Sequence, residues 1–133
     1  MKYALDTNTV IRFLRDDPIV CRKFDTAVER GDEIVIPPIV HYEVERGFLC
    51  KSAPRKENSY HILIEQCPVG EMSAEILENG AGIYAALYRA KLTIGDADIL
   101  IAAFCRVGGY TLVTNNVRHF NVIEGLKFED WVE

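Results

Sequence analysis

Three carboxylates stand at positions in this sequence where they could act together. Asp6 ends the apolar run 3–5, Glu43 lies in a segment with helical periodicity, and Asp98 directly precedes the apolar stretch 99–105. Ligand sets made only of oxygen atoms select hard divalent cations such as Mg²⁺ or Mn²⁺. Clustered carboxylates also repel one another and resist ionisation unless a cation offsets their charge. A divalent ion held by these groups would activate water for phosphodiester hydrolysis.

Two further residues are candidate ligands. Asn116 follows the clearest apolar run, 110–114, and Asp96 stands two positions before Asp98. The spacing favours Asp96 as a helix N-cap, and its role as a ligand stays an open alternative.

The three main acids each have a simpler interpretation as well. Asp6 is also placed to cap a helix, and Glu43 to carry a solvent-exposed charge beside its charged neighbours. Asp98 would be favoured at the positive end of a helix whatever its function. Their joint occurrence, with Asp98 at the mouth of an apolar helix, favours a common site.

The segments around these residues alternate between helical and strand-like patterns. Helices are predicted at 9–15 (capped by Thr7 or Asn8), 18–30 (capped by Asp17), 39–50, 54–66, 74–92 (capped by Ser73) and 96–107 (ended by Gly108 and Gly109). Strands are predicted at 3–5, 33–36, 67–72 and 110–114, with a short strand in the tail. Such alternation predicts an α/β fold in which helices cover both faces of a parallel sheet. We expect one domain spanning 1–133. The carboxyl ends of parallel strands share one edge, so the acids are expected to converge there.

Composition and charge restrict the class of protein. Hydrophobic residues make up 49% of the chain and charged residues 26%, which is typical of a globular protein. Fifteen Lys and Arg against twenty Asp and Glu give a net charge of −5, which disfavours direct binding of duplex DNA by this chain alone but permits RNA binding through a local basic patch. No apolar run approaches the roughly 20 residues that span a bilayer. We expect no membrane association and a cytoplasmic location.

The four cysteines, Cys21, Cys50, Cys67 and Cys105, form no C-x-x-C pair. In a reducing compartment they are interpreted as small buried hydrophobic residues. A zinc site is not indicated.

The sequence resembles the PIN-domain ribonucleases and, among them, the VapC-type toxins of bacterial toxin–antitoxin pairs. The matching motifs are LDTN at 5–8, PIVHYEVERG at 38–47, IGDADILIAA at 94–103, LVTNN at 112–116 with Phe120, and GLKFEDW at 125–131. The resemblance covers essentially the whole chain, and the motifs occur in the family order.

This resemblance implies an α/β/α sandwich with a central parallel sheet and a Mg²⁺- or Mn²⁺-dependent endoribonuclease. The residues that match the three recurrent acidic positions of the family are Asp6, Glu43 and Asp98. The fourth position is often Asp in the family and is Asn116 here, which lowers the negative charge of the site and leaves the number of metal ions open. Thr7 and Thr114 are expected to support the site by hydrogen bonds.

The resemblance also implies partners. They are an RNA substrate, with transfer RNA as the family-level expectation, a small antitoxin that docks over the active-site groove, and a second copy of the chain in a homodimer. The antitoxin is expected on the apolar side of 39–49 and on the helix after Pro54. The basic residues expected to contact RNA are Arg46, Lys51, Arg55, Lys56 and Arg118. His119 is interpreted as a loop residue or an RNA contact, because a metal-activated water needs no separate base.

Alternative functions remain open at this point. The chain could be a PIN-like RNA-binding module that has lost catalysis, an interpretation that Asn116 keeps open, or a PIN ribonuclease with no antitoxin. A phosphatase loop of the haloacid-dehalogenase type would use Asp6 as nucleophile and a second Asp two residues later. That position holds Asn8, so the sequence disfavours phosphatase chemistry.

Overall fold

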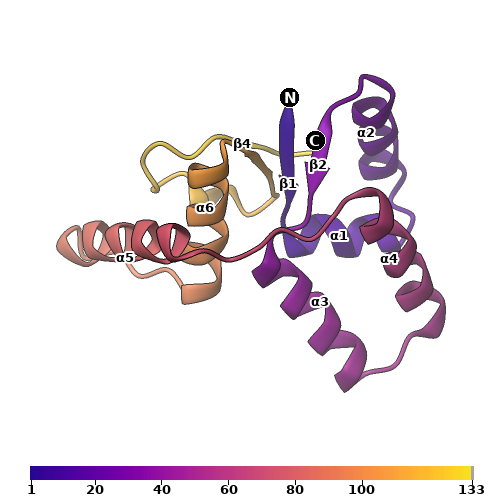
Figure 1. Ribbon diagram of the computed structural model, residues 1–133, viewed down its shortest axis with the longest axis horizontal. Coiled ribbons are helices and arrows are strands. Elements are labelled where there is room, and N and C mark those ends of the chain that lie inside the picture. The colour runs from indigo at the N-terminus through magenta and orange to yellow at the C-terminus, as the bar shows by residue number, and fades with distance from the viewer. Residues whose placement is uncertain (133) are drawn as a thin grey trace.

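A parallel sheet of short strands lies at the centre of the structure, a computed structural model that describes residues 1–132 (Figure 1). Its strands are β1 (Lys2–Leu5), β2 (Glu33–Val35), β3 (Thr111–Val113) and β4 (Phe128–Glu129), in the order β2-β1-β3-β4. In the central strand β1, Tyr3 pairs with Ile34 on one side and Thr111 on the other. A central strand with helices on both faces has no solvent-facing side, which explains its uninterrupted apolar run.

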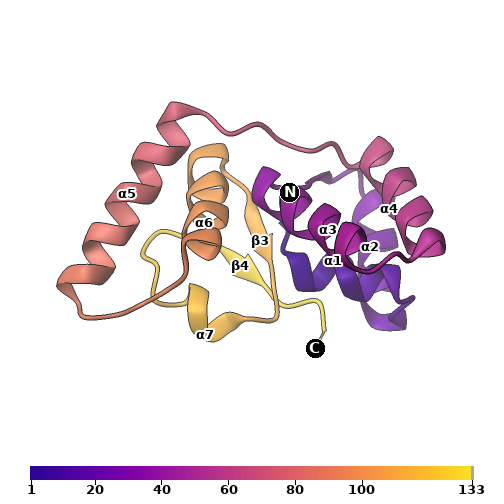
Figure 2. The same ribbon diagram turned by 90° about the horizontal axis from the view of Figure 1, so that it is seen from below.

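Helices surround the sheet. They are α1 (Thr7–Leu14), α2 (Pro18–Glu29), α3 (Pro38–Cys50), α4 (Pro54–Gln66), α5 (Ala74–Arg89), α6 (Asp96–Gly108) and α7 (Val117–Phe120). Figure 2 shows α5 and α6 at one end of the molecule and α1 to α4 at the other. Helix α3 contacts both α1 and α6, and it lies beyond the carboxyl end of β1, where the chain turns into α1 (Figure 1). The predicted α/β/α architecture is confirmed.

Several helix ends follow the predicted local signals. The Asp17 carboxylate accepts hydrogen bonds from the backbone N–H groups of Ile19 and Val20 and caps α2. The Ser73 hydroxyl caps α5 in the same way, through the N–H of Ile76. Gly109 ends α6 in the left-handed conformation, with φ of 71°, which glycine adopts without a steric penalty.

The caps predicted at Thr7 or Asn8 and at Asp96 are wrong, whereas the simpler interpretation of Asp6 as a helix cap is confirmed. Helix α1 starts at Thr7, and its N-cap is Asp6, whose side chain accepts the Thr7 N–H. Helix α6 has Gly95 as its N-cap, with extended backbone angles, and Asp96 is the first helical residue. A residue inside the first turn already has helical backbone angles, so Asp96 does not cap the helix.

The predicted strand at 67–72 is also wrong. This segment makes one isolated bridge, between Ile36 and Val69. The carbonyl of Pro68 accepts from the Ile36 N–H and the Gly70 N–H donates to the Ile36 carbonyl, but Pro68 has no N–H with which to extend the ladder. Helix α5 ends at Arg89 and not at residue 92, because Lys91 has a positive φ of 60°.

The cysteines divide into two groups. Cys67 and Cys105 are buried as predicted, whereas Cys21 is partly exposed and Cys50 is exposed. Cys50 is the last residue of α3, beside Leu49, whose exposed fraction is 86%. All four thiols are free. Within residues 1–132, no helix is both long and apolar enough to cross a bilayer.

Candidate active site

Asp6 is the most buried acid of the predicted site. It follows the central strand β1, only 5% of it is exposed, and its backbone N–H donates to the Val113 carbonyl of β3. Its Oδ1 accepts from the Thr7 N–H over 2.8 Å, and its Oδ2 accepts from the Thr114 hydroxyl over 2.7 Å. Both carboxylate oxygens therefore have a fixed direction before any ligand binds.

Glu43 reaches the same place from helix α3. Its Oε1 accepts a hydrogen bond of 2.7 Å from the Thr7 hydroxyl, and its Oε2 lies 3.6 Å from the Arg46 guanidinium. Thr7 thus contacts both Asp6 and Glu43, through its backbone N–H and its hydroxyl respectively. This one residue ties the end of β1 to α3.

Asp98 enters the site from the first turn of α6, and its side chain is 26% exposed. Its Oδ2 lies 2.9 Å from Nδ1 of His119 in α7. The same Nδ1 lies 2.9 Å from the side-chain amide of Asn116, and the Asn116 backbone N–H donates to the Thr114 hydroxyl. Asn116 is therefore joined to Asp98 through His119 and to Asp6 through Thr114.

The charges of these acids act on one another. Burial raises the pKa of Asp6 above its usual range, and the neighbouring Asp98 and Glu43 carboxylates raise it further. The hydrogen bonds from Thr114 and Thr7 lower the pKa and offset part of this increase. Asp98 and Glu43 therefore lie close enough to Asp6 to act on its charge.

A divalent cation fits this donor set in chemical type. The coupled donors are carboxylate oxygens, and a cation would stabilise the ionised form that burial disfavours in Asp6. Within residues 1–132, no three His, Cys, Asp or Glu side chains already form a group that could hold an ion. Without a cation the carboxylates repel, and each is held by its own donor, so binding would require small side-chain movements.

Asp96 is separated from this network. It is exposed at the start of α6, and no hydrogen bond or ion pair joins it to the other acids within the described chain. The geometry gives no support to Asp96 as a ligand.

Basic side chains surround a groove that leads away from Glu43. A hollow of about 230 Å³ between α1, α3 and α4 is lined by Glu43, by the apolar Ile11, Leu14 and Phe48, and by three cations, Arg15, Lys51 and Lys56. An adjoining hollow of about 370 Å³ shares Leu14, Arg15 and Lys56 and adds Arg55. The structure therefore brings Lys51, Arg55 and Lys56 to one side of the acidic site.

Arg15 is the basic residue that the sequence analysis missed. It lines both of these hollows and also a third one with Asn8 and Asn115, close to the end of β1. The signal was present, because Asn8, Ile11 and Arg15 are spaced at i, i+3 and i+7 and so share one face of α1. The predicted basic contacts lay near Glu43 and Asn116 and included no residue of α1.

The other predicted RNA contacts lie elsewhere on the site. Arg46 is engaged by Glu43 and lies over the Tyr42 ring, 5.2 Å from its centroid. Arg118 is exposed on α7, beside His119. His119 was predicted to be a loop residue or an RNA contact. It is not in a loop, since it is helical and lies against Asp98.

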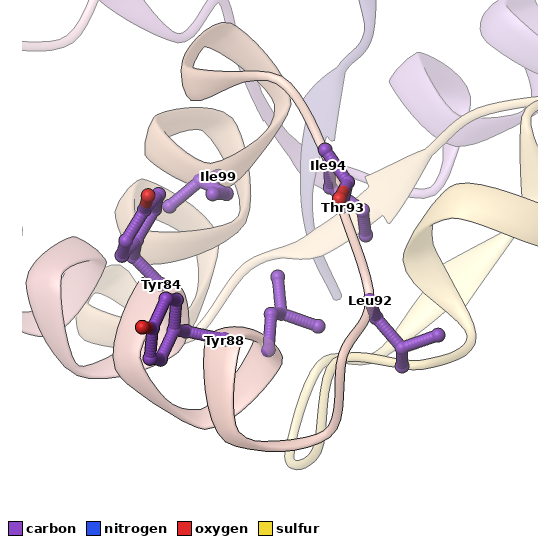
Figure 3. Close-up of a pocket in the computed structure, with 7 residues that line it drawn as sticks. Tyr84, Tyr88, Leu92, Thr93, Ile94 and Ile99 are labelled. Atoms are coloured by element: carbon purple, nitrogen blue, oxygen red, sulfur yellow. The ribbon is translucent and has the colours of Figure 1, made fainter.

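A separate small cavity of about 80 Å³ lies between α5, the start of α6 and the segment joining them (Figure 3). Its lining is mainly apolar and includes Tyr84, Tyr88 and Leu92, with no charged side chain. It shares no residue with the acidic network. This cavity carries no polar group suited to the predicted chemistry.

Fold and site together define an α/β/α protein with an acidic centre at the carboxyl edge of a parallel sheet. The family model described as the PIN domain matches residues 3–126. The chain belongs to the PIN domain family.

Known proteins of similar length support this assignment. The chain is 29% identical over 133 residues to "Ribonuclease VapC2" of Rickettsia felis, covering 98% of each chain. It is 28% identical over 137 residues to the "tRNA(fMet)-specific endonuclease VapC" of Salmonella typhimurium, again covering 98% of each. Among solved structures, VapBC2 of R. felis bound to a promoter DNA fragment matches with a TM-score of 0.90 and 26% identity, covering 98% of this chain and 99% of that one.

Proposed function

We propose that this protein is a metal-dependent endoribonuclease and the toxin of a toxin–antitoxin pair. The observation that carries the proposal is the buried carboxylate of Asp6, coupled to Glu43 and Asp98 at the carboxyl edge of the sheet. The similarity to VapC ribonucleases over nearly the full length supports the same activity. Transfer RNA is the proposed substrate class, because one of these relatives is named for cleaving it.

Asp6, Glu43 and Asp98 are the proposed ligands of Mg²⁺ or Mn²⁺, and Asn116 is a further candidate ligand near Asp98. When bound, such an ion activates water for attack on phosphorus and offsets charge on the phosphate. Thr7 and Thr114 orient the carboxylates, each through a hydrogen bond of 2.7 Å. Burial around Asp6 strengthens its attraction for a cation, because the local dielectric constant is low.

The basic groove is the proposed path of the RNA backbone. Arg15, Lys51 and Lys56 line a hollow together with Glu43, so a phosphate chain bound there would lead into the acidic centre. Arg46, Arg55 and Arg118 are proposed as additional contacts at its margins. The groove places positive charge next to the acids although the chain as a whole has a net charge of −5.

The antitoxin is proposed to cover the same region. Leu49, Tyr42 and Ile62 expose apolar side chains on α3 and α4, with exposed fractions of 86%, 59% and 54%. The floor of the nearby hollow is also apolar, formed by Ile11, Leu14 and Phe48. Exposed apolar side chains beside a lined groove favour a partner that buries them. The similarity to a VapBC structure supports an antitoxin as that partner.

A homodimer through α5 is proposed as the assembly. Leu77, Tyr84 and Tyr88 are exposed on α5 by 50%, 54% and 74%, and the two tyrosines project from the same side of the helix (Figure 3). The acids Glu75 and Glu78 lie near the start of α5, and Arg89 ends it. Two antiparallel copies of α5 would therefore bring opposite charges together at both ends of the interface.

We place the protein in the cytoplasm, where its RNA substrate is found.

The test is RNA cleavage by the purified protein in Mg²⁺ or Mn²⁺. We expect cleavage to stop on chelation and to fall by at least about 10²-fold in Asp6→Asn and Asp98→Asn, since each loses a charged ligand. Asp25→Asn is the matched control, because Asp25 is an exposed acid on α2. Full cleavage by Asp98→Asn would contradict the proposed site.

A second candidate function is RNA binding without catalysis, which Asn116 in place of an acid favours. Tight RNA binding with no cleavage at any divalent metal concentration would support it. Growth arrest on expression of the protein alone, relieved by a co-expressed partner, would distinguish a toxin from a ribonuclease with no antitoxin.

A further inference from the structure

His119 connects two residues of the proposed site that come from different elements. Its Nδ1 lies 2.9 Å from Oδ2 of Asp98 in α6 and 2.9 Å from the side-chain amide of Asn116, the N-cap residue of α7. The His119 side chain is 51% exposed and that of Asp98 is 26% exposed. This contact joins α7 to the first turn of α6, next to the acidic centre.

The hydrogen on Nδ1 follows from the chemistry of its neighbours. An ionised carboxylate only accepts hydrogen bonds, so a hydrogen bond to Asp98 requires that Nδ1 of His119 carries the hydrogen. The atom of Asn116 that lies 2.9 Å from this Nδ1 is the amide nitrogen, so Nδ1–H donates to Asn116 only if the amide is reversed and its oxygen accepts. The two ends of an amide are interchangeable in such assignments.

The bond from His119 restrains one oxygen of Asp98 and leaves the other available. Within residues 1–132, Oδ1 of Asp98 accepts no hydrogen bond, whereas Oδ2 is held by His119. Asp98 is partly exposed and lies close enough to the Asp6 carboxylate for their like charges to interact. Repulsion alone would favour turning its carboxylate out into solvent. The contact with His119 opposes that movement.

We propose that His119 is a positioning residue that holds Asp98 through Oδ2 and presents Oδ1 to the divalent cation of the site. This inference rests on the proposed function. Hydrogen-bond partners behind a metal-binding carboxylate orient it, and their loss typically weakens metal affinity or activity by about 10–100-fold. His119 makes such a hydrogen bond to Asp98. Thr7 makes the corresponding bond to Glu43, and Thr114 makes it to Asp6.

A purely structural role for His119 is the competing explanation. The next residue, Phe120, is fully buried, so α7 has an anchor of its own in the core. If His119 only attached α7 to α6, its removal would lower the stability of the metal-free protein and leave metal affinity unchanged. Metal affinity and metal-free stability therefore distinguish the two roles.

The experiment titrates Mn²⁺ into metal-free, full-length protein and follows binding by calorimetry, alongside thermal unfolding in chelator. The variants are His119→Ala, His119→Asn and His119→Gln. The side-chain nitrogen of Asn is as many bonds from Cα as Nδ1 of His, whereas that of Gln is one bond further. His61→Ala is the matched control, since His61 is an exposed histidine 3.4 Å from another acid, Glu45.

We expect His119→Ala to weaken Mn²⁺ binding by about 10–100-fold and His119→Gln to weaken it equally. His119→Asn should restore most of the affinity. The control His61→Ala should bind Mn²⁺ like the wild-type protein. Wild-type affinity in His119→Ala would overturn the proposal. Unchanged Mn²⁺ affinity together with a lower unfolding temperature in chelator would overturn it in favour of the structural role. A loss of affinity that Asn does not restore would show that the Nδ1 hydrogen bond is not its cause, which also overturns the proposal. Absence of both Mn²⁺ binding and RNA cleavage in the wild-type protein would instead be a failure of the proposed function.

Discussion

The Thr114 hydroxyl donates a hydrogen bond of 2.7 Å to Oδ2 of Asp6, although 108 positions separate the two residues in the chain. The same hydroxyl oxygen accepts the backbone N–H of Asn116 over 3.0 Å. Thr114 is fully buried, and only 5% of Asp6 is exposed. One hydroxyl thus satisfies a buried carboxylate and fixes the start of the loop that carries Asn116.

Thr114→Val should destabilise the protein without changing the shape of the core. Valine has nearly the same volume but leaves the Asp6 carboxylate without its donor and the Asn116 N–H without its acceptor. We expect the free energy of unfolding to fall by about 1–3 kcal/mol, the usual cost of an unsatisfied buried polar group. Urea unfolding in chelator measures it. Thr114→Ser keeps the hydroxyl and should lose less stability than Thr114→Val. Wild-type stability in Thr114→Val would contradict the role given to these hydrogen bonds.

Asp6→Asn should change how the stability of the metal-free protein depends on pH. The pKa of Asp6 is raised in the folded protein from 3.8, so its contribution to stability is complete below that pH and is lost as pH rises through the folded pKa. The unfolding temperature of Asp6→Asn relative to wild type should therefore increase as the pH rises above 3.8 and level off once the pH exceeds the raised pKa of Asp6. Addition of Mg²⁺ should stabilise the wild-type protein and should not stabilise Asp6→Asn. A difference that is independent of pH would contradict this interpretation of Asp6.

Arg15→Ala should weaken RNA binding and reduce its dependence on salt. Arg15 lines each hollow of the basic groove, and each phosphate contact that is lost lowers the slope of log K against log salt concentration by about 0.7–1. Binding is measured in an Asp98→Asn background so that cleavage does not interfere. Arg22→Ala removes the same charge from an exposed position on α2 and should leave the slope unchanged. Equal effects of the two substitutions would mean that only net charge matters.

Alkylation of the native protein should label Cys50 before the other cysteines. Cys50 is exposed, whereas Cys67 and Cys105 are buried. Burial raises the pKa of the Cys67 thiol to about 11, and it also raises the pKa of Cys105, so little thiolate is available at either position. Mass spectrometry over a time course with iodoacetamide follows the order of labelling. Early modification of Cys105 would show that α6 opens readily.

Tyr84→Glu or Tyr88→Glu should convert the proposed homodimer into a monomer. Tyr84 and Tyr88 are exposed on the same side of α5, and a carboxylate buried at an interface costs several kcal/mol. Light scattering after gel filtration reports the mass, again in an Asp98→Asn background. Ile62→Glu is the control, since Ile62 is similarly exposed on α4. A wild-type protein that is already monomeric at high concentration would exclude the dimer.

The sequence by itself determined the elements whose signals are local. The apolar run 3–5 gave a buried central strand, and the caps of α2 and α5 were predicted at Asp17 and Ser73 because cap and helix lie within three residues of each other. Gly109 ends α6 for an equally local reason, its left-handed backbone. The local pattern gave a wrong prediction at 67–72. This segment forms one isolated bridge and no strand, because Pro68 has no N–H with which to extend the pairing.

The sequence also selected Asp6, Glu43 and Asp98, through the order and type of the residues around them. Only the tertiary structure decided which group contacts which oxygen: Thr7 to Glu43, Thr114 to Asp6, and His119 to Asp98. These contacts join residues that are 21 to 108 positions apart. Hydrogen bonds of this kind depend on where β1, α3, α6 and α7 pack relative to one another, and that placement is set by the whole core. No periodicity within one segment specifies it.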